Sequence, residues 1–289
     1  MSTAPRAALR TIEKVVEIDA PIDAVWKALT EAVELTRWFP LEARFEARHG
    51  GKVFLSWGPQ CEGEGTVDVF EPLKRLRWRE PAPVPPHAAG AGSPRPEPVE
   101  LPAVEWLLEG KGGKTVLRLV NSGLSAESWG DEYHDSLDYG WGFMLANLRL
   151  YLERHHGKPR LVAWPRRNVA LPRPEAWHRL LAADDFAGLR TLSSRRTGDH
   201  ASLCAAGDTF EGAVEFFLPP RGFCLRLDDF ASSSVTPGQR GNPALLWLSI
   251  EGGGPKCEVG FWLSAYGVPQ ADVDSFGARW QAALDTAFS

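Results

Sequence analysis

A long helical segment near the middle of the chain constrains the fold more than any other feature of the sequence. Residues 129–156 carry apolar side chains at helical spacing, about 100° per residue. One apolar stripe consists of Tyr133, Leu137, Trp141, Met144, Leu148 and Tyr151. A second stripe, on nearly the opposite side, consists of Tyr139, Phe143, Ala146 and Leu150. Because an apolar stripe left in water is unfavourable, we expect the sheet of the same domain to cover one stripe. The second half of the chain, or a dimer partner, would cover the other.

Before this helix, the sequence predicts a strand, two short helices and an antiparallel meander. Residues 11–18 alternate loosely as a strand does, and Asp19 can cap a helix that begins near Pro21. A second short helix follows, and then five or six strand candidates separated by turn residues. The first candidate, residues 41–48, precedes the Gly50-Gly51 pair, which is typical of a hairpin turn.

Alternation within these strands predicts which side chains face the core. The predicted core positions are Val53, Leu55, Trp57, Val67, Val69, Leu76 and Trp78. Basic residues alternate with Leu76 and Trp78. This basic strip consists of Lys74, Arg75, Arg77 and Arg79. The strip fits the solvent face of a strand better than an anion-binding or partner-docking surface.

Residues 81–98 interrupt the meander. Seven of these 18 positions are proline, and most of the others are alanine, glycine or polar residues. Proline cannot donate a backbone hydrogen bond to a sheet, so we expect an exposed, partly disordered loop between two strands.

The second half of the chain repeats the plan of the first less clearly. Residues 161–171 read as an opening strand, and residues 171–182 as a helix with Trp177 where the first copy has Trp26. Residues 188–195 and 200–207 flank a turn at Gly198, and further strands lead to a last helix that begins near Gln270. The repeat predicts an internal duplication of about 140 residues. The expected domains are residues 1–157 and 158–289.

Composition excludes several classes of partner. The net charge is −5, and neither half has the basic excess that sequence-independent nucleic-acid binding or a polybasic membrane anchor requires. No stretch approaches the roughly 18 apolar residues of a membrane span, and the N-terminal residues lack the apolar core of a secretory signal. We expect a soluble cytoplasmic protein, without integral membrane segments or nucleic-acid binding, whose partners are uncharged, hydrophobic or proteinaceous.

The ionisable residues give no metal or cofactor signature. The four cysteines form no Cys-x-x-Cys pair, and no Cys/His spacing typical of a metal site occurs. Glu132, His134, Asp135 and Asp138 stand together, but acidic residues at the start of a helix are favoured by its dipole. We therefore predict no metal ligands, no cofactor and no catalytic residues.

The first half resembles the START-like helix-grip superfamily (SRPBCC). Within it, the likeness is to bacterial proteins related to the C-terminal domain of the activator of heat-shock protein 90 ATPase. The residues that carry the resemblance lie in order over residues 12–157. They are APIDAVWKALTEAVELTRWFP (20–40), GGKVFLSW (50–57), EGEGTVDVFEPLKRLRWRE (62–80) and HDSLDYGWGFMLANLRLYLE (134–153). The second half is similar to a degenerate copy.

The resemblance implies an α+β fold of two tandem helix-grip domains, each a curved antiparallel sheet around a long C-terminal helix. It also implies a cavity between sheet and helix, used in the superfamily for lipids and other apolar small molecules, for polyketide cyclisation or for chaperone contact. Tryptophans are suited to line such a cavity, although ordinary core packing explains each of them equally well.

The main hypothesis is a non-enzymatic protein that binds an apolar small molecule or lipid in the cavity of the first domain. The expected ligand-binding residues are Trp57, Trp78, Trp106, Tyr133, Leu137, Trp141 and Met144. The expected interdomain residues are Tyr139, Phe143, Ala146 and Leu150. One alternative is a protein-interaction module that contacts a chaperone or another protein. Another is a cyclase or hydrolase, for which Glu105 and Arg118 would have to face the cavity.

Overall fold

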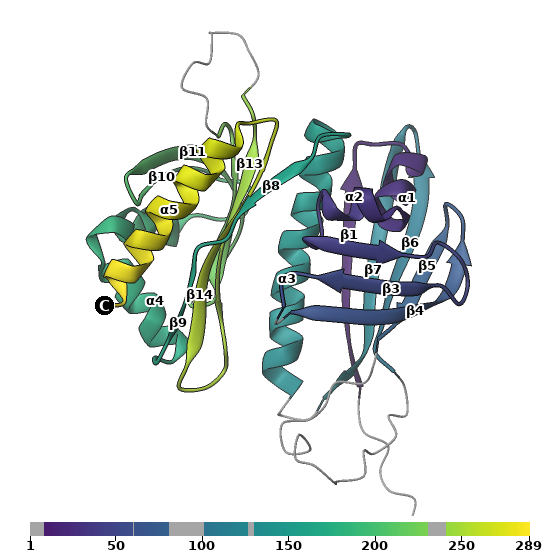
Figure 1. Cartoon of the computed structure of the whole chain (residues 1–289), viewed down its shortest axis with the longest axis horizontal. Coiled ribbons are helices and arrows are strands. Elements are labelled where there is room, and N and C mark those ends of the chain that lie inside the picture. The colour runs from purple at the N-terminus through teal and green to yellow at the C-terminus, as the bar shows by residue number, and fades with distance from the viewer. Residues whose placement is uncertain (1–8, 60, 81–100, 127–129, 231–240) are drawn as a thin grey trace, which may run out of the picture. The chain divides into compact units, whose positions relative to one another are not determined.

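The structure is a computed structural model that describes residues 9–59, 61–80, 101–126, 130–230 and 241–289 (Figure 1). The proline-rich segment 81–98 lies outside the described residues. The chain divides into two compact units, one up to His156 and one from Gly157 onward. In the described part of the chain, no helix is both long enough and apolar enough to cross a membrane.

The first unit is an antiparallel sheet with one long helix on its face (Figure 1). Its strands lie in the order β1-β7-β6-β5-β4-β3-β2. The strands are β1 (Leu9–Ile18), β2 (Glu42–Phe45), β3 (Lys52–Ser56), β4 (Glu62–Glu71), β5 (Arg75–Arg79), β6 (Ala103–Lys111) and β7 (Lys114–Ser125). The helices are α1 (Ile22–Thr30), α2 (Ala32–Thr36) and α3 (Asp131–Leu150), and α3 ends in a π-helical turn, Tyr151–His155.

Alternation places the core of this unit on one face of the sheet. In β7, Leu117 and Leu119 are fully buried, whereas Arg118 between them pairs with Glu13 of β1. The same period buries Leu76 and Trp78 in β5. The predicted alternation of Leu76 and Trp78 with basic residues is therefore confirmed for β5.

Strand β4 departs from simple alternation. The register of β4 against β5 shifts between Val67 and Val69, as at a β-bulge, so that Val67 is opposite Trp78 but Phe70 is opposite Leu76. Phe70 then packs on Trp26 of α1, with ring centroids 5.4 Å apart. The expectation that Val67 and Val69 share the core face is wrong because the extra residue turns Val69 away.

The start of α1 is also different from the prediction. Helix α1 begins after Pro21, which occupies the N-cap position without a side-chain capping bond. Asp19 does not cap it. Instead, the Asp19 backbone N–H donates to Glu153 Oε1 at 2.9 Å, which ties the chain before α1 to the turn that follows α3.

The second unit repeats this topology, but its described residues form no strand at the edge where β2 lies in the first unit. Its strands are β8 (Arg160–Ala163), β9 (Arg166–Val169), β10 (His200–Ala205), β11 (Asp208–Leu218), β12 (Gly222–Leu227), β13 (Ala244–Glu251) and β14 (Cys257–Tyr266). Their order is β10-β11-β12-β13-β14-β8, and β9 also pairs with β14. Thus β14 corresponds to β7, and β8 with β9 corresponds to β1. No described strand corresponds to β2. The described chain is an α+β protein of two tandem helix-grip units.

Three helical segments complete the second unit. They are α4 (Arg173–Ala182), a 3₁₀ segment η4 (Asp184–Ser194) and α5 (Gln270–Ala287). Two predictions need correction. Residues 188–195 belong largely to η4 and not to a strand, and residues 161–171 form two strands because Pro165 breaks the run between them.

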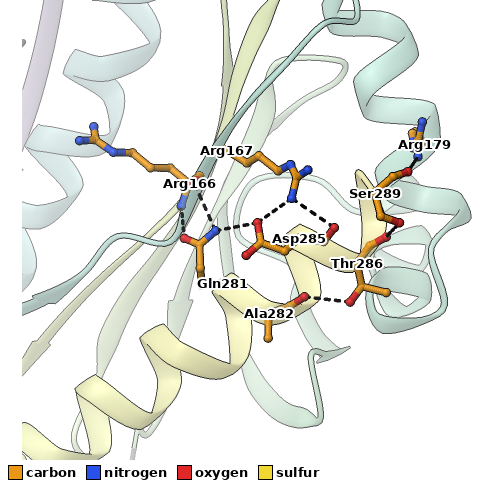
Figure 2. A network of polar contacts seen from close by, with 8 residues as sticks. All are labelled: Arg166, Arg167, Arg179, Gln281, Ala282, Asp285, Thr286 and Ser289. Atoms are coloured by element: carbon orange, nitrogen blue, oxygen red, sulfur yellow. Dashed lines mark hydrogen bonds and ion pairs between the residues drawn. The ribbon is translucent and has the colours of Figure 1, made fainter.

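Polar contacts anchor the C-terminal end of α5 (Figure 2). Arg179 of α4 donates to the backbone oxygens of Ala287, at 2.9 Å, and Ser289, at 2.5 Å. Arg167 of β9 donates to Asp285 Oδ1 at 2.7 Å. Since the last carbonyls of a helix lack intrahelical partners, the Arg179 guanidinium stabilises this end both by hydrogen bonding and by its charge.

Candidate functional site

The space between the sheet and α3 in the first unit contains aromatic rings. We define the aromatic cluster as Trp38, Phe39, Trp57, Trp78, Trp106 and Trp141. Phe39 lies at its centre, with its ring centroid 5.0 Å from that of Trp57 and 5.2 Å from that of Trp141. Trp106 contacts Trp141 edge to face at 5.5 Å. The protein's own side chains therefore occupy this part of the space between the sheet and α3.

Three indoles of the cluster donate their N–H groups within the protein. Trp38 donates to the Ala28 carbonyl at 2.8 Å, and Trp141 donates to Asn121 Oδ1 at 3.1 Å. Trp78 makes a longer contact, 3.4 Å, to a carboxylate oxygen of Glu80. These bonds fix three rings of the cluster in orientation.

The other two indoles differ. The Nε1 atoms of Trp57 and Trp106 are buried, and neither has a hydrogen-bond partner among the described residues. Trp106 is completely buried. A buried donor without an acceptor costs about 1–3 kcal/mol, so two in one cluster call for an explanation.

A buried amide connects the sheet to α3. Asn121 of β7 accepts the Trp141 N–H and donates through Nδ2 to the Ala103 carbonyl of β6 at 3.1 Å. On α3 itself, Asn147 donates to the Trp38 carbonyl at 2.6 Å. The Asn121 contacts hold the middle of α3 in one register against β6 and β7.

The predicted ligand-binding residues lie along the space between the sheet and α3. Trp78, Trp106, Trp141 and Met144 are buried, whereas Trp57 and Leu137 are half-buried. Tyr133, in the first turn of α3, is 39% exposed. The structure thus brings the tryptophans together. It places Tyr133 at the exposed edge of the space between the sheet and α3, which we call the rim. Their role as ligand contacts stays a prediction. Phe39, which the sequence analysis did not select, is the residue that joins Trp57 to Trp141.

The rim contains ionisable groups. Burial raises the pKa of Tyr133 to about 12, and the nearby charges of Glu80 and Cys61 add to this shift. Burial also raises the pKa of Glu80, against the hydrogen bond from Trp78. Burial therefore disfavours the charged forms of both the phenol and the carboxyl group.

The second stripe of α3 is largely buried. Tyr139, Phe143 and Leu150 are buried, and Ala146 is half-buried. That these residues contact the second domain stays a prediction.

Two carboxylates pair with arginines of the basic strip on β5. Arg75 pairs with Glu105 at 2.6 Å, and Arg77 and Arg79 both pair with Asp68. Burial works to raise the pKa of Asp68, but the hydrogen bonds from Arg77 and Arg79 outweigh it and hold the pKa below its usual value. Two carboxylates thus pair with three of the four cations of the strip, so the strip keeps a net positive charge.

Glu105 and Arg118 do not face the cluster. Glu105 pairs with Arg75, and Arg118 pairs with Glu13 at 2.8 Å, on the sheet face opposite Trp106. The expectation that Glu105 and Arg118 could face the space between the sheet and α3 is wrong, because alternation along β6 and β7 turns their side chains to the other face of the sheet. Among the described residues, no group of three or more His, Cys, Asp and Glu side chains is placed to hold a metal ion.

Residues 19–153 match the sequence profile of the family described as Activator of Hsp90 ATPase homolog 1-like protein. The first unit is a START-like helix-grip domain related to this family. Its sheet order and its terminal helix α3 agree with that assignment. No curated protein matches the chain.

Three solved structures illustrate the likeness. The Aha1 protein of Colwellia psychrerythraea is 20% identical over 51% of this chain and 99% of its own, with a TM-score of 0.42. DynU16, from the dynemicin biosynthetic locus, is 20% identical over 96% of this chain and 97% of its own, with a TM-score of 0.40. BexL, a di-domain ARO/CYC of the BE-7585A pathway, is 14% identical over 96% and 97%, also with a TM-score of 0.40. At these scores the likeness carries no argument about activity.

Proposed function

We propose that the first unit binds an apolar, mainly aromatic small molecule that carries at least one hydrogen-bond acceptor, between its sheet and α3. The observation that carries this proposal is the pair of buried indole N–H groups, Trp57 and Trp106, for which the described residues supply no acceptor. A carbonyl or ether oxygen of a guest would satisfy them. The surrounding rings would contact the apolar body of the guest.

The exposure of the rim supports a route to these donors. Trp57 and Leu137 are half-buried and Tyr133 is exposed, so side chains on this side can move without opening the whole core. Trp106 is held behind them by Trp38, Trp78 and Trp141. A guest would therefore displace Leu137 and Tyr133 and leave the tryptophan rings in place.

Two flat probe molecules of nearly equal shape, one a ketone and the other a hydrocarbon, test the proposal. We expect 9-fluorenone, which has a carbonyl acceptor, to bind about tenfold more tightly than fluorene, because one hydrogen bond is worth about 1 kcal/mol or more in a buried site. Titration monitored by tryptophan fluorescence and by calorimetry measures both affinities. The Trp106→Phe variant keeps a ring but removes the N–H, so it should lose most of this preference.

The matched control is Trp177→Phe in the second unit, where Trp177 is also buried. It should keep the wild-type preference for fluorenone. The proposal would be rejected if neither probe bound saturably. It would also be rejected if Trp106→Phe preferred fluorenone as strongly as the wild type does, because the Trp106 N–H would then not be the donor to the guest.

A further inference from the structure

The first unit has a hollow of about 880 Å³ across β2 to β5. Its lining consists of Arg44, Phe45, Glu46, Lys52, Val53, Phe54, Glu64, Gly65, Thr66, Asp68, Arg79, Glu80 and Leu101. Phe45, Val53 and Gly65 lie opposite one another on three neighbouring strands. Gly65 is required there, since a Cβ would come within 2.9 Å of the Arg79 carbonyl oxygen. The hollow is large enough for a small molecule.

The cations of this lining already have partners. Arg79 pairs with Asp68. Arg44 lies 3.9 Å from the centre of the Phe54 ring. The Lys52 ammonium donates to the Thr66 hydroxyl at 3.2 Å.

Two carboxylates of the lining remain without a cation. Within the described ranges, neither Glu64 nor Glu80 forms an ion pair. Glu80 is half-buried, directly after β5, and its backbone N–H donates to the Pro102 carbonyl at 2.8 Å. Glu80 therefore contributes to the hollow a carboxyl group that forms no ion pair with a cation of the described chain.

Aromatic rings adjoin Glu80. Trp78 Nε1 is 3.4 Å from Glu80 Oε1, and the Trp78 ring meets Phe45 edge to face with centroids 6.2 Å apart. A carboxylate beside aromatic rings is a combination that attracts organic ammonium groups, because the ring faces and the carboxylate both stabilise a weakly hydrated cation.

We propose that this hollow binds a small organic cation of the tertiary or quaternary ammonium class, with Glu80 as its counter-ion and the ring of Phe45 against its alkyl groups. This is a different ligand chemistry from the one proposed for the aromatic cluster, and it does not depend on that proposal. The Glu80 carboxylate, which has no ion-pair partner among the described residues, is the reason why the site would prefer a cation to a neutral molecule of the same shape.

Binding should be linked to proton release. Burial raises the pKa of Glu80, and only the ionised carboxylate attracts the cation, so affinity should increase as the pH rises through this pKa. The Tyr133 phenol interacts with Glu80, and the other ionisable groups of the lining are Arg44, Glu46, Lys52, Glu64, Asp68 and Arg79. Tyr133, with a pKa of about 12, stays neutral between pH 5 and pH 7.5.

The test compares choline with 3,3-dimethylbutan-1-ol, its neutral carbon analogue, on the full chain. We expect the wild type to bind choline at least about tenfold more tightly than the alcohol, as measured by calorimetry and by chemical-shift titration. Glu80→Gln should abolish this preference. Glu71→Gln, which removes an exposed carboxylate of β4 outside the hollow, should keep it.

The pH profile provides a measurement that needs no variant. In a titration from acidic pH upward, choline affinity of the wild type should rise by up to about tenfold per pH unit while Glu80 is still losing its proton, and affinity for the alcohol should stay flat. The proposal is overturned if the wild type does not prefer choline, or if choline affinity is independent of pH. Equal choline binding by a folded Glu80→Gln variant would overturn it as well.

Discussion

Replacing Trp280 by alanine is expected to lower the free energy of unfolding of the second unit by about 3–5 kcal/mol. Trp280 of α5 is completely buried, and its ring contacts Phe261 at 4.7 Å and Phe276 at 4.7 Å between centroids. It also contacts Phe186, in the 3₁₀ segment, at 5.8 Å. Removing the indole would leave a cavity among three aromatic side chains that close packing cannot readily refill.

A conservative variant separates packing from hydrogen bonding at this position. Trp280 Nε1 donates to Asp208 Oδ2 at 2.8 Å, so Trp280→Phe keeps a ring but leaves this carboxylate with Arg279 alone. We expect Trp280→Phe to cost about 1–2 kcal/mol, well below the alanine variant.

Amide hydrogen exchange measures these effects in the full chain. Exchange from β13 and β14 reports the second unit, and exchange from β6 and β7 reports the first unit as an internal control. A loss of less than about 1 kcal/mol for Trp280→Ala would contradict the assignment of Trp280 to the centre of the core.

Replacing Asn121 by alanine is expected to destabilise the first unit by about 2–4 kcal/mol. Asn121 is 2% exposed, and its amide satisfies both the Trp141 N–H and the Ala103 carbonyl. Alanine would leave two buried polar groups unpaired and would release α3 from β7. Urea unfolding and exchange from β6 and β7 measure the loss.

A double variant isolates the contact between the sheet and the helix. Trp141→Phe removes the donor, so Asn121→Ala should cost clearly less in the Trp141→Phe background than in the wild type. We expect a coupling free energy of about 1–2 kcal/mol. Additive losses would mean that the Asn121–Trp141 bond does not position α3. Lys27→Ala, on the exposed side of α1, is a control that should change stability by less than about 0.5 kcal/mol.

The spacing of apolar residues predicted much of this fold, because a helix or strand with one face against a core buries its residues at regular intervals. The spacing of Trp141, Leu148 and Tyr151 identified α3, and the alternation of Leu76 and Trp78 identified β5. The bulge at Val67 and Val69 escaped prediction because one inserted residue leaves no mark in the apolar pattern. Residues 188–195 were misassigned because the segment has only two large apolar residues, Leu189 and Leu192, which are too few to distinguish a strand from a helical turn.

The candidate site was predicted less completely than the fold. Composition pointed to the tryptophans, but only the structure places Phe39 between two of them. The difference between donating and unpaired indoles depends on neighbours distant in sequence, such as Asn121 for Trp141. Glu80 gave no local signal either, since its unusual environment arises where β5 ends beside Trp78.

The indole resonances of the ¹⁵N-labelled full chain test the central claim most directly. Trp38 and Trp141 already donate to protein acceptors, so their N–H signals should barely move when 9-fluorenone is added. The N–H signals of Trp57 and Trp106 should shift downfield in a saturable manner, because each gains an acceptor. If these two signals stay in place at saturating fluorenone, or if all indoles move alike, the first unit does not bind an acceptor-bearing guest in the aromatic cluster.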